Sequence, residues 1–490
     1  METKKKTPAE PGQMQQIVAT AIVNLSALIY GTIVGWASPM TPKLQSPDPP
    51  VGLTPMSDEV VSWLTGVLCI GALMGTPVFG AISEKFGRKI AGCLLTIPYG
   101  ICWITTIFAQ DQTYLLVARF FAGVGASGSI LLVPLYVGEI ASSGRRGMLG
   151  SLLVLFINVG ILIGFVAGAI LSFKVFAICA LVLPLCYLGA FVFLPESPVY
   201  LVRCNRTKDA ARALLWLRGG DKPTVDRELL SLQAQVKEAA ALNGKVSFKD
   251  LFANKGTFKG LIIVLGLLGG QQLCGIFAMV NYAATIFQMA GSSMSPNTAS
   301  IIVGAIQVFG SYLSTSLMER AGRKLLILIS CIGMCICHCT LGTFCYLQAL
   351  KYEVSSFSWI PVTALSVYVV VYCLGMGPAP FVVASEVFSA EMSSLANSVS
   401  LIFLWALGFF VVKLFGTFMG LFGIHGCFFI LAAFCSCTFV FTLILVPETK
   451  GRTIQSILDE LNGFPVNSHN GDYRTTNIEV KKDFPIPEQV

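Results

Sequence analysis

Apolar runs long enough to cross a bilayer recur along the whole of this 490-residue chain. About 20 predominantly apolar residues in a helix span the hydrocarbon core of a membrane. Hydrophobic residues make up 54% of the sequence and charged residues only 12%, about half the charge of an average soluble domain. The sequence therefore predicts an all-α membrane protein with twelve transmembrane helices, at about 17–37, 60–82, 90–109, 115–137, 149–171, 174–194, 258–280, 298–318, 325–347, 360–384, 394–417 and 424–446.

The positions of lysine and arginine predict how these helices are oriented. With both termini inside the cell, cytoplasmic segments hold 28 of the 33 lysines and arginines, a bias typical of cytoplasmic loops. We therefore expect a multi-pass plasma-membrane protein with cytoplasmic termini. No cleavable signal peptide is expected, because residues 1–16 are polar and the first apolar run is long. The net charge of +7 reflects this orientation, and no nucleic-acid partner is predicted.

Two charged loops of similar sequence stand half a chain apart. Residues 80–89 read Gly-Ala-Ile-Ser-Glu-Lys-Phe-Gly-Arg-Lys, and residues 319–324 read Glu-Arg-Ala-Gly-Arg-Lys. In each loop a glycine permits a tight turn, and the cations mark the cytoplasmic end of a helix. The repeat predicts two six-helix halves, with the chain divided into a cytoplasmic arm (1–16), an N-terminal half (17–194), a helical linker (195–257), a C-terminal half (258–446) and a cytoplasmic tail (447–490).

Glycine and proline interrupt two of the expected helices, near 269–275 and 375–381. Irregular backbone is tolerated at membrane depth where it lines a cavity, and paired interruptions indicate the binding site of a transporter. Gln271 and Gln272 lie at the first interruption, and Gln307 lies in the next helix. These glutamines could instead hold helices together by hydrogen bonds. Beside the glycines, a site for a polar ligand is the better interpretation.

Arg119 is a cation within the fourth expected helix, near its outer end. A charge inside a span is costly unless it is paired or hydrated. Two interpretations remain open for this residue. It either extends to the membrane surface or lines a cavity.

No enzymatic chemistry is predicted. The three histidines are scattered, and the sequence contains no nucleophile–base arrangement or phosphate loop. None of the sixteen cysteines falls clearly in an external loop, so no disulfide framework is implied. Cysteines at 331, 335, 337 and 339 surround His338 with helical spacing inside a span, where cysteine acts as a small apolar residue. We therefore expect no enzyme activity, no cofactor and no metal, and no obligate protein partner is evident.

In combination, the motifs resemble those of the sugar-porter branch of the major facilitator superfamily over residues 17–460. The resemblance implies the major facilitator fold and alternating access around a central sugar site. Gly35-Trp36, Ser38-Pro39 and Val412-Lys413 are similar, within that branch, to the insect facilitated trehalose transporters. The motifs that carry the wider resemblance are the two Gly-Arg-Lys loops, Pro134…Glu139…Arg146-Gly147, Pro195-Glu196-Ser197-Pro198, Gln271-Gln272…Gly275, Gly377-Pro378-Ala379-Pro380 and Pro447-Glu448-Thr449.

The resemblance also implies which residues contact the sugar. Four family positions have changed, since Val154 stands where many glucose transporters have a glutamine, Phe277 replaces the usual asparagine, Cys373 a glutamate and Phe381 the usual tryptophan. Fewer hydrogen bonds to hydroxyl groups predict an altered sugar selectivity. The candidate substrate-binding residues are Gln271, Gln272, Gln307, Trp405, Phe277, Asn281, Phe381 and Thr32.

Charged residues beside the two loops are expected to gate the cytoplasmic side. The family pattern implies that they pair when the protein faces outward and separate when it opens inward. Ser393 stands where the C-terminal half would carry a matching cation, which predicts that the two halves are latched unequally unless neighbouring cations compensate. The candidate gating residues are Glu84, Arg88, Glu139 and Arg146 in the first half and Glu319, Arg323 and Glu386 in the second.

Three functions are compatible with this sequence. The favoured one is facilitative, uncoupled transport of trehalose or another small sugar. The alternatives are a proton-coupled or non-sugar porter on the same fold, and a sugar sensor that does not transport. Proton-coupled relatives carry a carboxylate in their first helix, and the matching position in this chain is Thr32. In addition, no expected span interior contains Asp or Glu. A buried proton site requires such a titratable group.

Overall fold

The apolar runs form helices, because a helix satisfies its own backbone N–H and carbonyl groups where no water is available. The computed structural model describes residues 12–142, 145–241, 250–289, 295–388, 390–452 and 454–463. All regular elements within these residues are helical. The first of them are α1 (Gln13–Leu44), α2 (Asp58–Phe86), α3 (Arg88–Leu94), α4 (Thr96–Ile107), α5 (Gln112–Ile140), α6 (Arg146–Ile170) and α7 (Phe173–Phe191).

Three shorter helices link the two halves of the chain, namely α8 (Pro198–Arg203), α9 (Thr207–Leu217) and α10 (Lys222–Ala241). The remaining elements include one 3₁₀ turn, η1 (Ser355–Phe357). They are α11 (Asp250–Ala253), α12 (Lys255–Leu273), α13 (Ile276–Asn281), α14 (Ala283–Met289), α15 (Pro296–Ala321), α16 (Arg323–Ala349), α17 (Ile360–Leu374), α18 (Ala379–Val387), α19 (Ala390–Leu445) and α20 (Ile454–Asn462).

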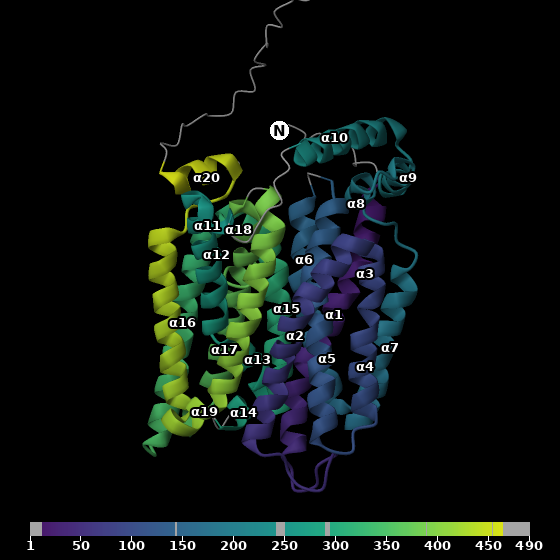
Figure 1. Ribbon diagram of the computed structural model, residues 1–490. Helices are drawn as coiled ribbons and strands as arrows, with labels where there is room; N and C mark the ends of the chain where they lie inside the picture. Colours follow the sequence, from purple (N-terminus) through teal and green to yellow (C-terminus); the bar gives the residue numbers. More distant parts are fainter. Residues whose placement is uncertain are drawn as a thin grey trace, which may run out of the picture.

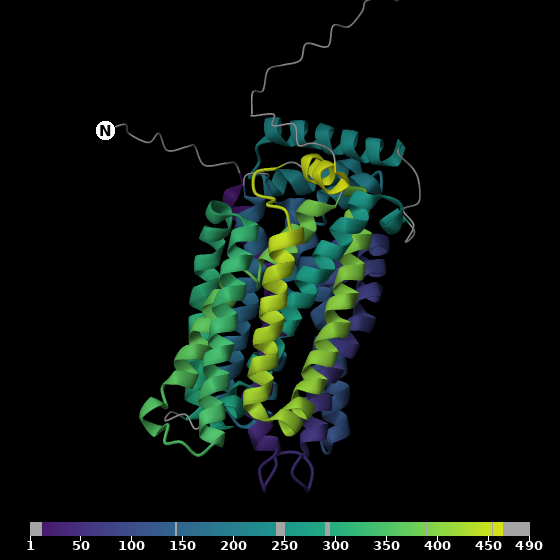
Figure 2. The same cartoon turned by 90° about the vertical axis from the view of Figure 1, so that its left-hand side faces the viewer.

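The described residues contain 10 helical stretches that are long and apolar enough to cross a membrane. One of them, Leu395–Leu445, covers two expected crossings, because α19 bends sharply at Gly423, where φ is 68°. Figure 2 shows the second arm of α19 running back alongside the first. Helix α15 fills the expected run at 298–318. With this helix and the two arms of α19, the structure accounts for all of the predicted apolar runs.

The helices form two bundles that lie side by side (Figure 1). One bundle contains α1 to α7, coloured purple to blue, and the other contains α12 to α19, coloured teal to yellow. Helices α8, α9, α10 and α20 lie across one end of the molecule, which we call the linker end. The opposite end, called the far end, carries the loop between α1 and α2 and the bend of α19.

The linker helices are attached to the N-terminal bundle by capping and charge contacts. Ser197 caps α8, since its side chain accepts a hydrogen bond from the backbone N–H of Tyr200. Arg218 donates from Nη1 to the carbonyl of Ile140 at 3.0 Å, and its Nε pairs with Glu228 at 2.9 Å. Arg218 thereby joins α9, α10 and the last turn of α5.

Helices α1 and α6 pack with their backbones in direct contact. A methyl group added to Gly31 would lie 2.0 Å from the carbonyl oxygen of Ile157. A methyl group on Gly160 would lie 2.2 Å from the carbonyl oxygen of Leu28. Small residues commonly permit such close approach between helices in lipid. This contact fixes α1 against α6 where both helices reach the centre of the molecule.

The contact predicts a difference between two glycine substitutions. Gly160→Ala should destabilise the protein by about 1–3 kcal/mol or more, because the added methyl overlaps the backbone of α1. Gly189→Ala is the matched control, since nothing lies within 4 Å of a methyl group at that position. It should be neutral or stabilising, because alanine favours a helix by up to about 1 kcal/mol over glycine. Thermal denaturation of the purified protein in detergent measures both effects, and equal midpoints for the two variants would contradict the packing argument.

Candidate functional site

Two helices of the C-terminal bundle are broken at similar depth, as the sequence predicts. Helix α12 ends at Leu273, Gly275 adopts a φ of 87°, and α13 continues from Ile276. The second break separates α17 from α18 at residues 375–378. Both breaks free backbone carbonyl groups that a continuous helix would have used.

Side chains from neighbouring helices satisfy the freed carbonyl groups. Gln271 donates from Nε2 to the carbonyls of Met376 at 3.0 Å and Gly377 at 2.7 Å. The carbonyl of Cys274 accepts from the hydroxyl of Tyr368 at 2.9 Å and lies 3.0 Å from Nε2 of His338. Gln271 therefore ties the first break to the second.

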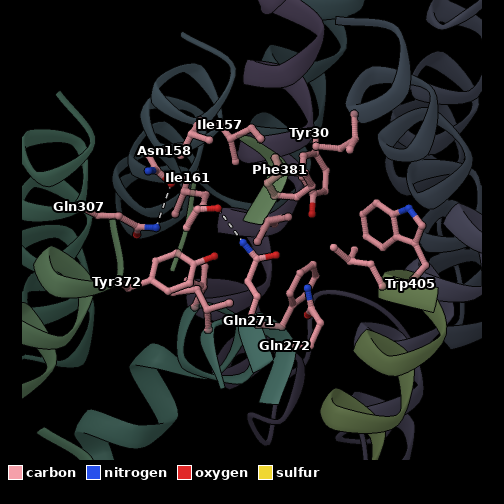
Figure 3. Close-up of a pocket in the computed structure, with 18 residues that line it drawn as sticks. Tyr30, Ile157, Asn158, Ile161, Gln271, Gln272, Gln307, Tyr372, Phe381 and Trp405 are labelled. Atoms are coloured by element: carbon pink, nitrogen blue, oxygen red, sulfur yellow. Dashed lines mark hydrogen bonds between the residues drawn. The ribbon is translucent and has the colours of Figure 1, made fainter. Parts of the chain in front are cut away.

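A cavity of about 120 Å³ lies beside these breaks, between the two bundles (Figure 3). Helices α1, α5 and α6 of the first bundle and six helical segments of the second provide its wall. The lining residues are Tyr30, Val34, Ile130, Val154, Ile157, Asn158, Ile161, Gln271, Gln272, Ile276, Phe277, Val280, Gln307, Tyr372, Gly377, Phe381, Leu404 and Trp405.

Six of the eight candidate substrate-binding residues line this cavity, and two do not. Gln271, Gln272, Gln307, Phe277, Phe381 and Trp405 are among the lining residues. Asn281 instead donates to the carbonyl of Phe277 at 2.8 Å, one turn back in the same helix. Thr32 donates to the carbonyl of Leu28 at 3.0 Å in the same way. The side chains of Asn281 and Thr32 thus serve their own helices.

Two of the predicted residues present hydrogen-bonding groups that no described residue satisfies. Oε1 of Gln272 and Nε1 of Trp405 are both buried without a partner among the described residues. One is an acceptor and the other a donor. Phe277 packs edge-on against the Trp405 ring at 6.2 Å, and Tyr30 does so at the same centroid distance from the first bundle.

Asn158 is a site residue that the sequence reasoning missed. Its Oδ1 accepts a hydrogen bond from Nε2 of Gln307 at 2.9 Å, and its Nδ2 donates to Ser311. The pair joins α6 of one bundle to α15 of the other. An asparagine inside an otherwise apolar span is a signal that could have identified it. Tyr30 and Tyr372 were also missed, since tyrosines in apolar helices are common and carry little information by themselves.

Further hydrogen bonds join the two bundles at the far end. The hydroxyl groups of Thr65 and Tyr282 are 3.2 Å apart, and the backbone N–H of Ala284 donates to Ser38 at 3.0 Å. Lys413 donates from Nζ to the hydroxyl of Ser62 at 2.8 Å. These contacts hold the bundles together on the far side of the cavity.

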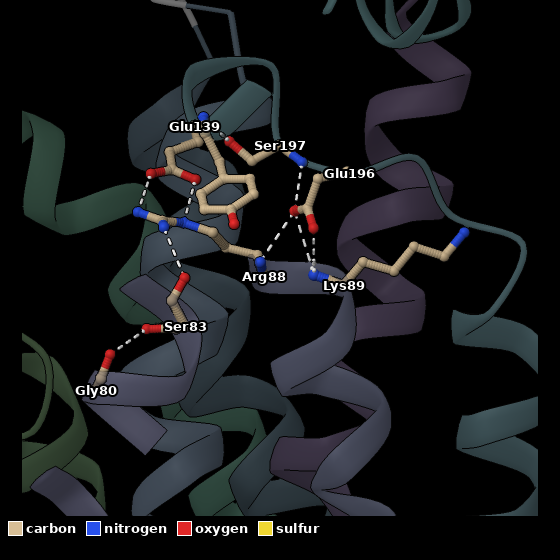
Figure 4. Close-up of polar contacts among 8 residues, drawn as sticks. Gly80, Ser83, Arg88, Lys89, Glu139, Glu196 and Ser197 are labelled. Atoms are coloured by element: carbon tan, nitrogen blue, oxygen red, sulfur yellow. Dashed lines mark hydrogen bonds and ion pairs between the residues drawn. The ribbon is translucent and has the colours of Figure 1, made fainter. Parts of the chain in front are cut away.

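At the linker end, Arg88 and Glu139 form a buried ion pair (Figure 4). Nε and Nη2 of Arg88 contact the two carboxylate oxygens of Glu139 at 2.9 and 2.8 Å. Nη1 donates to the carbonyl of Ser83 at 2.9 Å. Bidentate pairs of this kind are the strongest geometry for arginine and carboxylate.

Glu196 caps the start of α3, beside this ion pair (Figure 4). It accepts hydrogen bonds from the backbone N–H groups of Arg88 at 3.0 Å, Lys89 at 3.1 Å and Ser197 at 2.8 Å. A methyl group on Gly87, where φ is 96°, would lie 2.3 Å from this carboxylate. Burial raises the pKa of the Glu196 carboxyl, against the opposing effect of the N–H groups that donate to it.

The C-terminal bundle repeats this arrangement with a weaker ion pair. Glu448 caps α16 by accepting from the backbone N–H groups of Arg323 at 3.0 Å and Lys324 at 3.1 Å. Nη2 of Arg323 pairs with Oε1 of Glu386 at 2.9 Å. Nε of Arg323 and Oε2 of Glu386 are buried without a partner among the described residues. The second pair is therefore monodentate where the first is bidentate.

Of the remaining candidate gating residues, only Glu84 has a side chain that the structure describes. The side chain of Glu84 is exposed at the end of α2. The side chains of Arg146, Glu319 and Ser393 lie outside the residues that the structure describes. The predicted loss of a cation at Ser393 therefore stays a prediction. The difference between the bidentate Arg88 pair and the monodentate Arg323 pair does not depend on Ser393.

Nearly the whole chain matches the sequence model of one known family. The family is described as sugar (and other) transporter, and the match covers residues 13–461. The chain belongs to the sugar transporter family. It is therefore a membrane transporter by family and not an enzyme.

Several curated relatives of this sugar transporter are named facilitated trehalose transporter Tret1. The Anopheles gambiae protein is 33% identical over 448 residues, which are 91% of this chain and 56% of the relative. The Culex quinquefasciatus protein is 32% identical over 456 residues, 93% of this chain and 87% of the relative. The Bombyx mori protein is 31% identical over 468 residues, 96% of this chain and 90% of the relative. The transporter thus spans little more than half of the first relative.

Solved structures identify the fold of the transporter. A structure of the proton:xylose symporter XylE bound to 6-bromo-6-deoxy-D-glucose has a TM-score of 0.74 at 20% identity, covering 92% of this chain and 99% of that one. A partially occluded inward open structure of XylE from E. coli has a TM-score of 0.75 at 19% identity, covering 90% and 100%. The transporter has the major facilitator fold, as predicted. At this identity the likeness concerns the fold alone.

The two ion pairs at the linker end predict unequal losses of stability. Glu139→Gln leaves the buried guanidinium of Arg88 without its bidentate partner, and breaking a buried pair costs about 3–5 kcal/mol. Glu386→Gln should cost less, because Arg323 makes one contact with that carboxylate and is less buried. Thermal midpoints of the two variants in detergent provide the comparison. An equal or larger drop for Glu386→Gln would show that the geometry of the pairs does not govern their contribution.

Proposed function

We propose that this member of the sugar transporter family is a facilitator that carries a small sugar across the plasma membrane without coupling to protons. The observation that carries the proposal is the cavity between the two bundles. It combines buried amide groups with aromatic rings at the breaks of α12–α13 and α17–α18. Ligand sites of this kind are largely apolar, with a few polar groups that fix orientation.

The amide groups and aromatic rings that line the cavity suit a sugar. Sugar hydroxyl groups both donate and accept hydrogen bonds, as do the side-chain amides of Gln272 and Asn158. Oε1 of Gln272 and Nε1 of Trp405 are buried without a partner among the described residues, and we propose that a sugar hydroxyl group supplies one. The rings of Trp405 and Phe381 offer flat apolar surfaces for the C–H faces of a pyranose. These features support a neutral polyhydroxyl substrate over an ionic one.

The cavity volume bears on the choice of sugar. At about 120 Å³ the cavity is smaller than the roughly 300–1,000 Å³ that is typical of ligand pockets, so a monosaccharide suits it better than a disaccharide. The relatives carry trehalose in their name, and trehalose is a disaccharide. We propose that a monosaccharide is accommodated in the arrangement described here. Trehalose would require the bundles to separate further.

The absence of acid groups at the cavity supports uncoupled transport. None of its lining residues is an aspartate or a glutamate, and α1 contains neither residue along its length. A proton-coupled carrier needs a group at membrane depth that gains and loses a proton. Without such a group, the sugar gradient alone drives net movement.

Alternating access follows from the unequal ends of the molecule. Thr65–Tyr282, Ser38–Ala284 and Ser62–Lys413 hold the bundles together at the far end. The Arg88–Glu139 and Arg323–Glu386 pairs each lie within one bundle. We propose that the linker end is cytoplasmic, in keeping with its lysines and arginines. The far-end contacts must then break for the cavity to open outward.

Uncoupled transport predicts that the sugar equilibrates and does not accumulate. Purified protein in proteoliposomes should raise internal radiolabelled glucose or trehalose to the external concentration and no further, whether or not a pH gradient is imposed. Accumulation driven by an inward proton gradient would contradict the proposal and favour the proton-coupled alternative. A folded protein that takes up none of the sugars tested, fructose included, would favour the sensor.

The cavity predicts different roles for two neighbouring amides. Gln272→Ala should weaken sugar affinity about five- to tenfold, because each lost hydrogen bond to a neutral group is worth about 1 kcal/mol or somewhat more. Asn281→Ala is the matched control, since that amide bonds its own helix and does not line the cavity. Concentration-dependent uptake at equal surface expression measures both. Unchanged affinity in Gln272→Ala would leave that residue as a helix-packing amide.

A further inference from the structure

A second and much smaller cavity lies within the N-terminal bundle, toward the far end. Its volume is about 10 Å³, enough for one particle the size of a water molecule. Trp36 from α1, Trp103 from α4 and Arg119 from α5 line it. Their exposed fractions are 3%, 2% and 4%. It shares no lining residue with the cavity between the bundles.

The polar groups around this small cavity are almost all donors. Nη1 of Arg119 donates to the carbonyl of Ile33 at 2.8 Å. Nε and Nη2 of Arg119, together with the indole Nε1 atoms of Trp36 and Trp103, are buried without an acceptor among the described residues. Indole and guanidinium nitrogens donate hydrogen bonds and accept none. Four donor nitrogens, on three side chains that line this cavity, therefore lack an acceptor among the described residues.

The charge of Arg119 is also unbalanced. Arg88 and Arg323 each pair with a carboxylate, but no described carboxylate lies within ion-pairing distance of Arg119. The guanidinium lies over the ring of Trp36 at 4.5 Å, which offsets part of its charge. A buried charge is costly unless it is paired. The remaining imbalance favours an anion over a neutral particle.

The donors also distinguish a monatomic anion from water. A water molecule accepts about two hydrogen bonds and must donate two of its own. The hydroxyl of Thr106, which donates to the carbonyl of Cys102 at 2.8 Å, is the one side-chain oxygen among the lining residues. A halide accepts from every donor and needs no acceptor in return. We propose that Arg119, Trp36 and Trp103 form a binding site for a single halide ion, with chloride as the expected occupant.

Thermal stability of the full-length protein in detergent tests this site, with sodium chloride and sodium gluconate compared at equal ionic strength. A ligand that binds only the folded state raises the unfolding midpoint. We expect the wild-type midpoint to be about 2 °C higher in chloride at saturation. Arg119→Gln should abolish this difference. Trp36→Phe combined with Trp103→Phe should reduce it by at least half, while keeping the cation and most of the packing.

Two controls separate the site from general salt effects. Lys174→Gln removes an exposed cation of the same bundle, and Trp359→Phe changes an exposed tryptophan outside the cavity. Both should keep the full chloride response. Equal midpoints of the wild type in chloride and gluconate would overturn the proposal and leave water as the occupant. A chloride response of the same size in the double tryptophan variant would also overturn it, even where Arg119→Gln fails to fold.

Discussion

The contact on which the centre of this transporter depends is the pair of hydrogen bonds from Gln271 to the carbonyls of Met376 and Gly377. In hydrocarbon a freed backbone carbonyl costs several kcal/mol unless it finds a partner. The break at 375–378 is tolerated because a side chain beside the other break supplies that partner. His338 and Tyr368 perform the same task for Cys274. Irregular backbone can therefore line a cavity at membrane depth.

The same contact assigns different tasks to two adjacent glutamines. Gln271 lines the cavity, but its amide nitrogen is already committed to the second break. Gln272 leaves its Oε1 without a protein partner. Sequence reasoning favoured ligand binding for these residues, with helix packing as the alternative. In the structure the amide of Gln271 holds the second helix break, whereas the amide oxygen of Gln272 has no partner among the described residues.

The two halves share a capping glutamate and an arginine–glutamate ion pair, and they differ in the geometry of that ion pair. Glu196 and Glu448 each accept backbone N–H groups at the start of a helix, and each lies where a side chain on Gly87 or Gly322 would collide with it. The repeated Gly-Arg-Lys loops are thus explained by a capping carboxylate, which follows 108 residues after Arg88 in one half and 125 residues after Arg323 in the other. The ion pairs beside these caps are unequal, since Arg88 holds both oxygens of Glu139 and Arg323 holds one of Glu386.

The sequence by itself determined the number and approximate bounds of the membrane crossings, the two-fold repeat and the breaks at Gly275 and 375–378. These follow from local properties, because apolar length, glycine and proline act within one helix. It also identified six residues of the cavity. Only the tertiary structure decided that Asn281 and Thr32 bond their own helices, and that Asn158 meets Gln307 across 149 residues. Such outcomes depend on the rotation of each helix about its axis and on which helices become neighbours, and both are set by packing between segments far apart in the chain.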